Sequence, residues 1–518
     1  MNGAESLVRT LLAQGVDTCF TNPGTSEMHF VAALDRIEGM RCVLGLFEGV
    51  VTGAADAYYR MARKPASTLL HLGPGLANGL ANLHNARKAH SGIVNIVGEH
   101  ALPHLALNAP LTSDIEGVAR PMSDWVRTAR SAAEVASIAQ DAVHAARRPP
   151  GQVATLVLPA DCAWGEVPDT ALAGQASMAH RRPTVDPDIV AAAARILASP
   201  EPTLLLAGGV ACFAEPLKAA GRIAAKTGCA VMTEFYVPRL ERGAGRVNVP
   251  RVPYAVDAAV AALARFRNIL LVGASDPVSF FAYPGKPGRQ AAPGCHVMQV
   301  AGAGDDLEGA LNALADATGA AKATPLLEAG MAPASLPSGP ITPDGIARVI
   351  AALLPENAIV IDESVSAGRA LGAPTAGAAP HDWLSVMGGS IGWGLPAAVG
   401  AAIAAPGRKV LSLEGDGSAM YTIQALWTLA REGLDVTVVI FANRAYQILL
   451  GEYAGVGAGT PGPRAGHMLR LDTPALDFVG LARSMGVEAA RATDLGSLAS
   501  ELRRGFASSG PYLIEAVL

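Results

Sequence analysis

The stretch of sequence that decides the fold spans residues 410–419 and reads VLSLEGDGSA. It begins as a short apolar run, typical of a buried strand, and the glycines on either side of Asp416 then turn the chain toward a helix pattern. A second β-branched run, residues 436–441, follows and leads to Asn443. A buried strand, a glycine turn, a helix and another buried strand form a βαβ unit, which predicts a parallel sheet covered by helices on both faces.

The same alternation of short apolar runs with Ala/Leu helix patterns fills three segments of the chain. We therefore expect an α/β protein with three doubly wound parallel-sheet domains, at residues 1–165, 188–320 and 342–518. Polar, proline-containing stretches at residues 174–187 and 321–340 are predicted to be linkers. In open sheets of this kind, ligands bind beyond the carboxyl ends of the strands, so the chemistry is expected there.

Composition limits the classes of protein that the chain could belong to. With 518 residues it exceeds what one hydrophobic core usually serves. Apolar residues make up 50% of it and the mean hydropathy is +0.30, which excludes intrinsic disorder. The formal net charge of -5 argues against non-specific nucleic-acid binding, because such binding needs a basic face. These values indicate a large, compact enzyme without naming its reaction.

The cysteines and the chain ends suggest a cytoplasmic protein. The six cysteines are scattered, with no CxxC pair, so buried thiols are expected rather than disulfides or a zinc site. The first residues lack a basic segment followed by an apolar stretch, so no signal peptide is expected. The longest apolar run, residues 391–405, contains Gly and Pro and is shorter than the roughly 20 residues that span a bilayer. No membrane partner is expected.

The ends of the two C-terminal strands carry residue types that suit a metal and a phosphate group. Asp416 offers a hard carboxylate oxygen for Mg²⁺, and the neighbouring glycines let backbone N–H groups approach an anion. Asn443 stands at the end of the next strand, where its amide oxygen can complete the same coordination shell. A lone GDG is usually an ordinary turn, but two matched strand ends favour a metal site.

This pattern, GDGS followed after a helix and a strand by Asn443, resembles the signature of thiamine-diphosphate-dependent enzymes. The resemblance implies a pyrimidine-binding, a central and a diphosphate-binding domain. It implies that Mg²⁺ is held by Asp416, Asn443 and the carbonyl of Ala445. It also implies that three residues lie beside the diphosphate of the cofactor: Gly415, Gly417 and Ser418. Relatives have two asparagines where this chain has Ala442-Asn443, so only the metal ligand is retained.

Glu48 directly follows an apolar run and opens a helix pattern in the N-terminal segment. A glutamate at a helix N-terminus is often stabilised simply by the helix macrodipole. A partly buried glutamate with a raised pKa could instead form a hydrogen bond with a heterocyclic nitrogen. Glu48 resembles the family's activating glutamate, which protonates N1′ of the aminopyrimidine, and we expect this catalytic role for it.

Further segments resemble those of benzoylformate decarboxylases and acetolactate synthases. NPGTSE at residues 22–27 resembles the loop over the aminopyrimidine, and HLGPGLAN at residues 71–78 combines the active-site histidine of the first group with the GPGxxN of the second. GGSIGWGLP at residues 388–396 resembles the segment that bends the cofactor, with Ile391 as the apolar wedge. The resemblance implies a catalytic role for His71 in proton transfer or carboxylate orientation. The cofactor contacts that it implies are Asn22, Pro23, Gly24, Thr25, Asn78, Gly389 through its carbonyl, Ile391, and the Ser366 hydroxyl near the diphosphate.

The central segment leaves a second cofactor open. Acetolactate synthases bind FAD there, whereas the site is often empty in decarboxylases. Glycines follow strands at residues 208–209 and 273, yet no GxGxxG opens a helix, so FAD stays an open alternative. The central domain of benzoylformate decarboxylase supplies a second active-site histidine. The corresponding stretch here, residues 277–283, reads PVSFFAY and predicts an apolar lining.

The resemblance implies an enzyme, a lyase or transferase, that decarboxylates a small 2-oxo acid with thiamine diphosphate and Mg²⁺. The resulting enamine is then either protonated, releasing an aldehyde, or joined to a second carbonyl by carboligation. Two alternatives stay open: an acetolactate-synthase-like carboligase with or without FAD, and a non-catalytic cofactor-binding paralogue. No cationic residue is obviously placed for a dicarboxylic substrate. Because relatives form the site between two subunits, a homodimer or homotetramer is expected.

Overall fold

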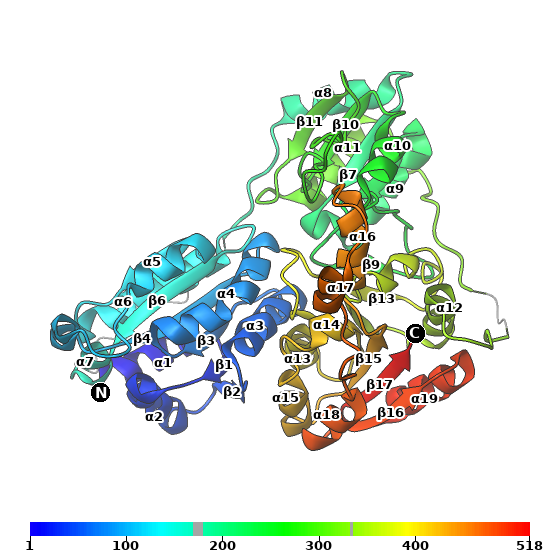
Figure 1. Cartoon of the computed structure of the whole chain (residues 1–518). Helices are drawn as coiled ribbons and strands as arrows, with labels where there is room; N and C mark the ends of the chain where they lie inside the picture. The colour runs from blue at the N-terminus through cyan, green and yellow to red at the C-terminus, as the bar shows by residue number, and fades with distance from the viewer. Residues whose placement is uncertain (169–179, 332–334) are drawn as a thin grey trace.

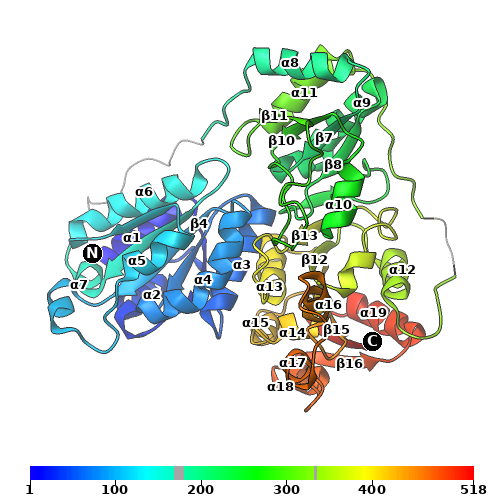
Figure 2. The ribbon, with the colours of Figure 1, turned by 45° about the horizontal axis from the view of Figure 1, so that its top comes forward.

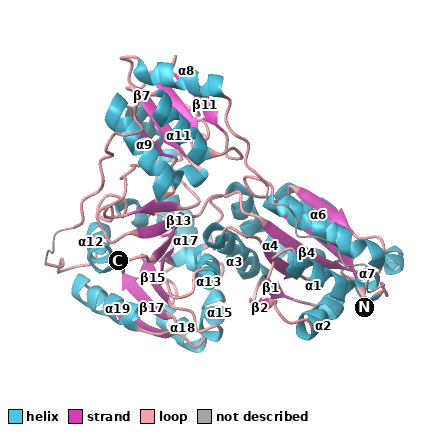
Figure 3. Ribbon diagram, turned by 180° about the vertical axis from the view of Figure 1, so that it is seen from behind, coloured by secondary structure: helices cyan, strands magenta, loops and turns pink. Residues whose placement is uncertain are grey.

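The computed structural model describes residues 1–168, 180–331 and 335–518, and it forms three α/β domains around a common junction (Figure 1). Helices cover the faces of the sheets in each domain (Figure 3). The three sheets contain six, four and seven strands. They confirm the predicted fold class. Residues 174–179 of the first predicted linker and residues 332–334 of the second lie outside the described residues, so the domain boundaries stay predictions.

The N-terminal sheet is entirely parallel and has the strand order β2-β1-β3-β4-β6-β5. Its strands are β1 (Thr18–Asn22), β2 (Arg41–Leu44), β3 (Ala66–Leu70), β4 (Ile93–Glu99), β5 (Trp125–Thr128) and β6 (Val153–Pro159). One face is covered by α1 (Gly3–Ala13), α2 (Met28–Arg36), α6 (Val135–Arg147) and α7 (Ala160–Trp164). The other is covered by α3 (Glu48–Ala62), α4 (Leu72–Lys88) and α5 (Ile115–Ala119). Both faces are apolar, as a buried parallel sheet requires.

The central sheet is also parallel, with the order β11-β10-β7-β8. Its strands are β7 (Thr203–Ala207), β8 (Ala230–Thr233), β10 (Asn268–Val272) and β11 (His296–Ala301). One face is covered by α8 (Pro187–Ala198), α9 (Ala214–Thr227) and α11 (Leu307–Ala317), and α10 (Val256–Leu263) covers the other. The strand order reverses between β7 and β10, which is where an open sheet forms its ligand crevice.

The C-terminal sheet has the order β16-β17-β15-β14-β12-β13-β9. Its parallel strands are β12 (Ile359–Glu363), β13 (His381–Ser385), β14 (Val410–Gly415), β15 (Val436–Ala442), β16 (Glu488–Ala492) and β17 (Tyr512–Val517). The helices α12 (Pro343–Leu353) and α19 (Leu495–Ala507) cover one face, and α13 (Gly394–Ala404), α15 (Ala425–Arg431) and α18 (Phe478–Ser484) cover the other. The strand, helix and strand predicted around Asp416 correspond to β14, α15 and β15.

One strand of this sheet departs from the sequence-based prediction. β9 (Leu240–Arg242) lies within the residues assigned to the central domain, yet it pairs antiparallel with β13 at the edge of the C-terminal sheet. The three-residue segment is too short to give a period-2 signal, and its pairing partner lies more than 130 residues away in sequence. The C-terminal sheet is therefore mixed at one edge.

The N-terminal and C-terminal domains share one hydrophobic core, in which α3 packs directly against α13 (Figures 1 and 2). Glycines permit this close approach. A β-carbon at Gly53 would lie 2.6 Å from Cβ of Pro396, and one at Gly400 would overlap the carbonyl oxygen of Ala54. The small residues that dominate the composition are therefore needed where two helix backbones meet.

A buried polar network crosses the same interface. Asp56, on α3, accepts hydrogen bonds from Nε of Arg60 at 2.9 Å, from Nε1 of Trp393 at 2.7 Å and from the hydroxyl of Ser91. Arg60 in turn donates to the carbonyl of Ser385 at 2.7 Å and stacks over the Trp393 ring. The network fixes the start of α13, which immediately follows the segment predicted to bend the cofactor.

The structure also bears on the predictions about membrane spans, cysteines and metal clusters. Within residues 1–168, 180–331 and 335–518, no helix combines the length and apolarity needed to cross a bilayer. All six cysteines are free thiols, and burial raises the pKa of Cys19 to about 12. Across the same residues, no cluster of three or more His, Cys, Asp or Glu side chains is arranged to hold a metal ion.

Candidate functional site

Glu48 is the first residue of α3 and its side chain is largely buried, at 8% exposure. One carboxylate oxygen, Oε2, accepts a hydrogen bond from Nδ2 of Asn78 at 3.0 Å. The other, Oε1, faces Gly75, where a β-carbon would lie only 2.9 Å away. A glycine at residue 75 therefore keeps open the space in front of this oxygen, so the Glu48 carboxyl is buried but accessible on one side.

His71 is held by a carboxylate that sequence analysis did not single out. Its Nδ1 lies 2.8 Å from Oε2 of Glu27, which also accepts from the backbone N–H of Gly24 at 2.8 Å. The Glu27 side chain is fully buried, and its other oxygen has no partner among the described residues. Because a carboxylate accepts, Nδ1 donates, and a neutral His71 has its Nε2 lone pair free. Glu27 is thus a positioning residue, recognisable only as the last residue of the NPGTSE loop.

The predicted residues around Glu27 form its immediate backbone. Asn22 ends β1, Pro23 and Gly24 form the turn, and Thr25 begins a short 3-10 helix that contains Glu27. A β-carbon at Gly24 would overlap the His71 ring, so only glycine permits this approach. The structure therefore brings the loop at residues 22–27 and His71 together at the carboxyl end of the N-terminal sheet.

Three asparagines on one face of α4 connect this cluster to the C-terminal domain. Asn78 holds Glu48, whereas Asn82 donates to the carbonyls of Gly49 at 2.8 Å and Gly392 at 3.1 Å. Asn85 accepts from the N–H groups of Gly388 and Ser390, and donates to the Ser390 carbonyl at 2.7 Å. Sequence analysis included only the first of the three. The spacing i, i+4, i+7 was the available signal, because it places all three on one helical face.

The segment at residues 388–392 is therefore tied to the N-terminal domain of its own chain. Its glycines are conformationally required: Gly389 has φ +70°, and a β-carbon there would lie 2.5 Å from Cζ of Phe280. Phe280 belongs to the central domain, so all three domains meet at this segment. Ile391 lies inside the segment at residues 388–392. Its side chain is half-buried, which suits a residue that contacts a ligand on one side.

Just beyond this segment, the start of α13 is anchored by a buried carboxyl. The backbone N–H groups of Trp393 and Gly394 donate to the carboxylate of Glu363, at the end of β12, over 2.8–3.1 Å. Burial raises the pKa of Glu363 to about 7. Sequence analysis did not single out Glu363.

Asp416 and Asn443 lie at the same sheet edge because β14 pairs in register with β15. Asp416 is buried, and its carboxylate accepts from the N–H of Gly417 at 2.8 Å and of Arg444 at 2.5 Å. Asn443 Oδ1 accepts from the N–H of Ala445 at 3.0 Å. Burial raises the pKa of Asp416, which means that its charged form lacks sufficient compensation from the protein alone.

The residues at this edge fit a magnesium ion and a diphosphate. Carboxylate, amide and backbone carbonyl oxygens are hard ligands of the kind that Mg²⁺ prefers. A cation would also compensate the buried Asp416 charge. Gly417 is required, because a β-carbon there would lie 2.5 Å from the Tyr446 ring. Ser418 is buried in the same turn and its hydroxyl faces Gly415.

Ser366 lies about 50 residues before Asp416 in sequence, and it lines a cavity together with residues of the central domain. It precedes a short 3-10 helix, Ala367–Ala370, and lines a cavity of about 310 Å³. Glu452, on α16 (Gln447–Gly455), lines the same cavity and accepts hydrogen bonds from the hydroxyls of Tyr283 at 2.8 Å and Tyr254 at 3.5 Å. The lining from the central domain is therefore partly polar. Within the stretch predicted to be an apolar lining, Phe280 and Phe281 pack against each other, whereas Tyr283 contributes its hydroxyl.

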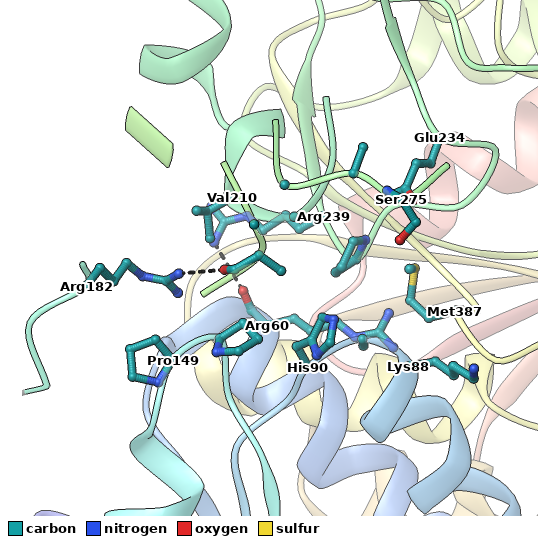
Figure 4. A pocket seen from close by; sticks show the side chains of 18 of the residues that line it. Arg60, Lys88, His90, Pro149, Arg182, Val210, Glu234, Arg239, Ser275 and Met387 are labelled. Carbon is teal, nitrogen blue, oxygen red and sulfur yellow. Dashed lines mark hydrogen bonds between the residues drawn. The ribbon is translucent and has the colours of Figure 1, made fainter. Parts of the chain in front are cut away.

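A second, larger cleft of about 570 Å³ lies between the N-terminal and central domains (Figure 4). Gly209 and Gly273, which follow β7 and β10, line it at the switch point of the central sheet. Its arginines are engaged: Arg182 donates to the carbonyls of Ala303 and Asp305, and Arg239 pairs with Asp382 at 2.9 Å.

The fold and the site together define a class of enzyme that carries a buried glutamate and a set of hard oxygen donors at the ends of separate sheets. Comparison with known proteins gives the same class. Residues 1–117 match the family described as "Thiamine pyrophosphate enzyme, N-terminal TPP binding domain", and residues 372–516 match "Thiamine pyrophosphate enzyme, C-terminal TPP binding domain".

Individual relatives cover the whole chain. It is 51% identical to a Mycobacterium tuberculosis protein named "Putative acetolactate synthase large subunit IlvX", over 100% of this chain and 99% of the relative. It is 32% identical to a benzoylformate decarboxylase of Pseudomonas aeruginosa, over 98% and 96%. The chain therefore belongs to the family of thiamine-diphosphate-dependent enzymes. The structure of a 4-hydroxybenzoylformate decarboxylase from Rhodococcus jostii shares the fold, with a TM-score of 0.83 at 24% identity over 99% and 98% of the two chains.

Proposed function

We propose that the chain is a thiamine-diphosphate- and Mg²⁺-dependent enzyme that decarboxylates a small 2-oxo acid. The observation that carries this proposal is the buried Glu48 carboxyl, held on one side by Asn78 and left open on the other by Gly75. Such a carboxyl is placed to form a hydrogen bond with a ring nitrogen of the cofactor. When bound, thiamine diphosphate supplies a carbanion and an electron sink.

The remaining residues have binding and positioning roles in this proposal. Asp416, Asn443 and the Ala445 carbonyl would hold the metal, and the GDGS turn would receive the diphosphate. Ile391 and the Gly389 carbonyl would contact the cofactor. His71, oriented by Glu27 at 2.8 Å, presents Nε2 to the substrate, where it orients the carboxylate or transfers a proton to the product.

A panel of 2-oxo acids tests this proposal. Purified protein is supplied with thiamine diphosphate and Mg²⁺, and both CO₂ and organic products are measured for wild type and for Glu48→Gln. We expect CO₂ release from at least one member of the panel and its loss in the variant. Absence of CO₂ release together with absence of cofactor binding, measured by calorimetry, contradicts the proposal. Binding without turnover would instead support the non-catalytic paralogue.

The second candidate function is carboligation of the acetolactate-synthase type, which the name of the 51% identical relative favours. The two candidates differ after CO₂ has left: one protonates the bound fragment, and the other joins it to a second carbonyl. Pyruvate as substrate distinguishes them, because carboligation gives acetolactate and protonation gives acetaldehyde. The absorption spectrum of the purified protein tests FAD separately.

We also propose that two copies of the chain complete each site. Exposed apolar side chains occur close in sequence to both sets of residues: Met28 and Leu46 beside Glu27 and Glu48, and Tyr421 and Leu449 a few positions after Asp416 and Asn443. Exposed apolar groups that gather on one surface mark a contact site. Their position supports a homodimer or homotetramer in which the N-terminal half of a site faces the C-terminal half from another subunit.

Mixed subunits test this arrangement. Glu48→Gln and Asp416→Asn chains carrying different tags are co-expressed, and the heterodimer is isolated. With two-fold symmetry, sites between subunits leave one of the two sites intact, so the heterodimer regains about half of the wild-type activity. Sites within one chain leave both defective, and the heterodimer stays as inactive as each parent.

A further inference from the structure

Three arginine side chains line a cavity of about 590 Å³ between the central and C-terminal domains. Arg242 comes from β9, Arg251 from the loop that follows it, and Arg369 from the 3-10 helix after Ser366. The cavity is separate from the cleft in Figure 4, with which it shares no lining residue. Its apolar walls include Val237, Leu240, Val249 and Ala376.

None of the three guanidinium groups has a carboxylate partner within the residues that the structure describes. Each lies over an aromatic ring instead: Arg242 over Trp383 at 5.3 Å, Arg251 over Phe235 at 5.1 Å and Arg369 over Tyr254 at 4.9 Å. Arg242 also donates to the carbonyl of Gly372 at 2.5 Å. Stacking on a ring leaves the edge donors of a guanidinium free for a ligand.

The charges facing the cavity do not balance. Glu328 is the one carboxylate among its lining residues, against three arginines. Burial and, to a smaller extent, the neighbouring charge of Arg251 lower the pKa of Arg242 to about 10, although Glu328 and Asp362 oppose the shift. By contrast, the arginines in the Figure 4 cleft include Arg60 and Arg239, which form short ion pairs. Burying the Arg242 charge without a carboxylate partner is costly, and a bound anion would remove that cost.

We propose that this cavity binds a small organic anion that carries two acidic groups, carboxylate or phosphate, on a short apolar body. Guanidinium groups bind both kinds of acid through paired N–H donors. The cavity volume lies within the range of small-molecule sites, and its mixture of apolar walls and a few charged groups is typical of them. This proposal does not depend on the proposed reaction.

The ligand would act close to the predicted active site. Arg369 and Tyr254 line both this cavity and the one that contains Ser366. The cavity wall also includes β9 and β13, the strands by which the central domain joins the C-terminal sheet. Binding there would therefore stabilise the domain junction beside the cofactor site, which is the position expected of an effector or of a distal substrate group.

Calorimetry on the full-length protein, saturated with thiamine diphosphate and Mg²⁺, tests the proposal. The probes are glutarate, a dicarboxylate, and 3-phosphoglycerate, which has one acid of each kind; acetate at equal ionic strength controls for weak anion binding. We expect at least one probe to bind, and to bind about tenfold more weakly in Arg251→Gln and Arg369→Gln, because each loses a charge-assisted contact. Arg348→Gln, an exposed arginine on α12, is the matched control and is expected to bind as wild type does.

Four results would overturn the proposal. Three concern the probes themselves: neither probe binds at concentrations up to about 10 mM, binding persists unchanged in both variants, or binding weakens equally in Arg348→Gln. Displacement of thiamine diphosphate by a probe would assign the binding to the diphosphate site and would also overturn it. Arg369 is exposed, so its variant is expected to fold normally, which its thermal midpoint without ligand verifies. Loss of decarboxylation without loss of probe binding would affect only the proposed function.

Discussion

Replacing Asp56 by Asn tests how the N-terminal and C-terminal domains are held together. The carboxylate is fully buried and accepts from Arg60, Ser91 and Trp393. Asparagine retains the shape but removes the charge, so the Arg60 guanidinium, 2% exposed, stays buried without its counter-ion. Breaking a buried pair in this way costs about 3–5 kcal/mol in free energy of unfolding.

Asp141→Asn is the matched control, because it makes the same chemical change in an exposed pair. Asp141 pairs with Arg127 at 2.9 Å, and both side chains are more than half exposed. The expected cost is about 0–1 kcal/mol. In guanidinium chloride, a loss of 4 kcal/mol corresponds to a midpoint lowered by about 1 M, whereas the control shifts by about 0.25 M or less.

Unfolding is followed by tryptophan emission, since Trp393 is fully buried in this network and moves into water when the interface opens. The double variant Asp56→Asn, Arg60→Met supplies a second measurement. It removes both charges, so it is expected to be more stable than Asp56→Asn alone. If Asp56→Asn unfolds at the same midpoint as Asp141→Asn, the interface does not depend on this ion pair and the reasoning is refuted.

Four further outcomes are expected. Glu48→Gln should lower the decarboxylation rate by at least about 100-fold while cofactor affinity, measured by calorimetry, changes little; an equal loss of affinity would argue for a binding role. Gly417→Ala should weaken cofactor binding because its methyl group meets an aromatic ring, whereas Gly451→Ala, on an open face of α16, should not. Chelation of Mg²⁺ should release the cofactor from wild type, and excess Mg²⁺ should restore it; an unchanged calorimetric affinity in EDTA would contradict the Asp416 assignment. Burial raises the pKa of Glu234 from 4.5 to about 7, so the folded state binds more protons than the unfolded state between these two values. The free energy of unfolding should therefore fall as pH rises through that window. The thermal midpoint of Glu234→Gln should not show this decline.

The sequence predicts most strongly where local pattern and chemistry coincide. The run from Val410 to Asn443 combines strand periodicity, glycine turns and hard oxygen ligands, and its structure is the predicted βαβ unit. Glu48 was recognisable because a carboxylate after an apolar run is unusual. In both places the contacts that matter are with residues a few positions away or on a neighbouring strand.

What escaped prediction depends on contacts between segments far apart in the chain. Glu27 orients His71 across 44 residues, and Asn85 holds Ser390 across 305. No local periodicity encodes such pairs, because each residue alone has an ordinary explanation as a loop carboxylate or a helix amide. The arginine cavity is a similar case, since Arg242 and Arg369 approach each other only after β9 has joined the C-terminal sheet.

The antiparallel pairing of β9 with β13 determines what can be exchanged between relatives. A chimaera cut at residues 188 and 320 would exchange β9 together with the central domain, and an incoming segment that does not match β13 would leave its backbone donors and acceptors without a partner. An open strand edge of that kind pairs readily with other chains. Recombination that keeps residues 240–242 with the C-terminal domain should therefore give soluble protein, whereas exchange at the apparent domain boundaries should give aggregates.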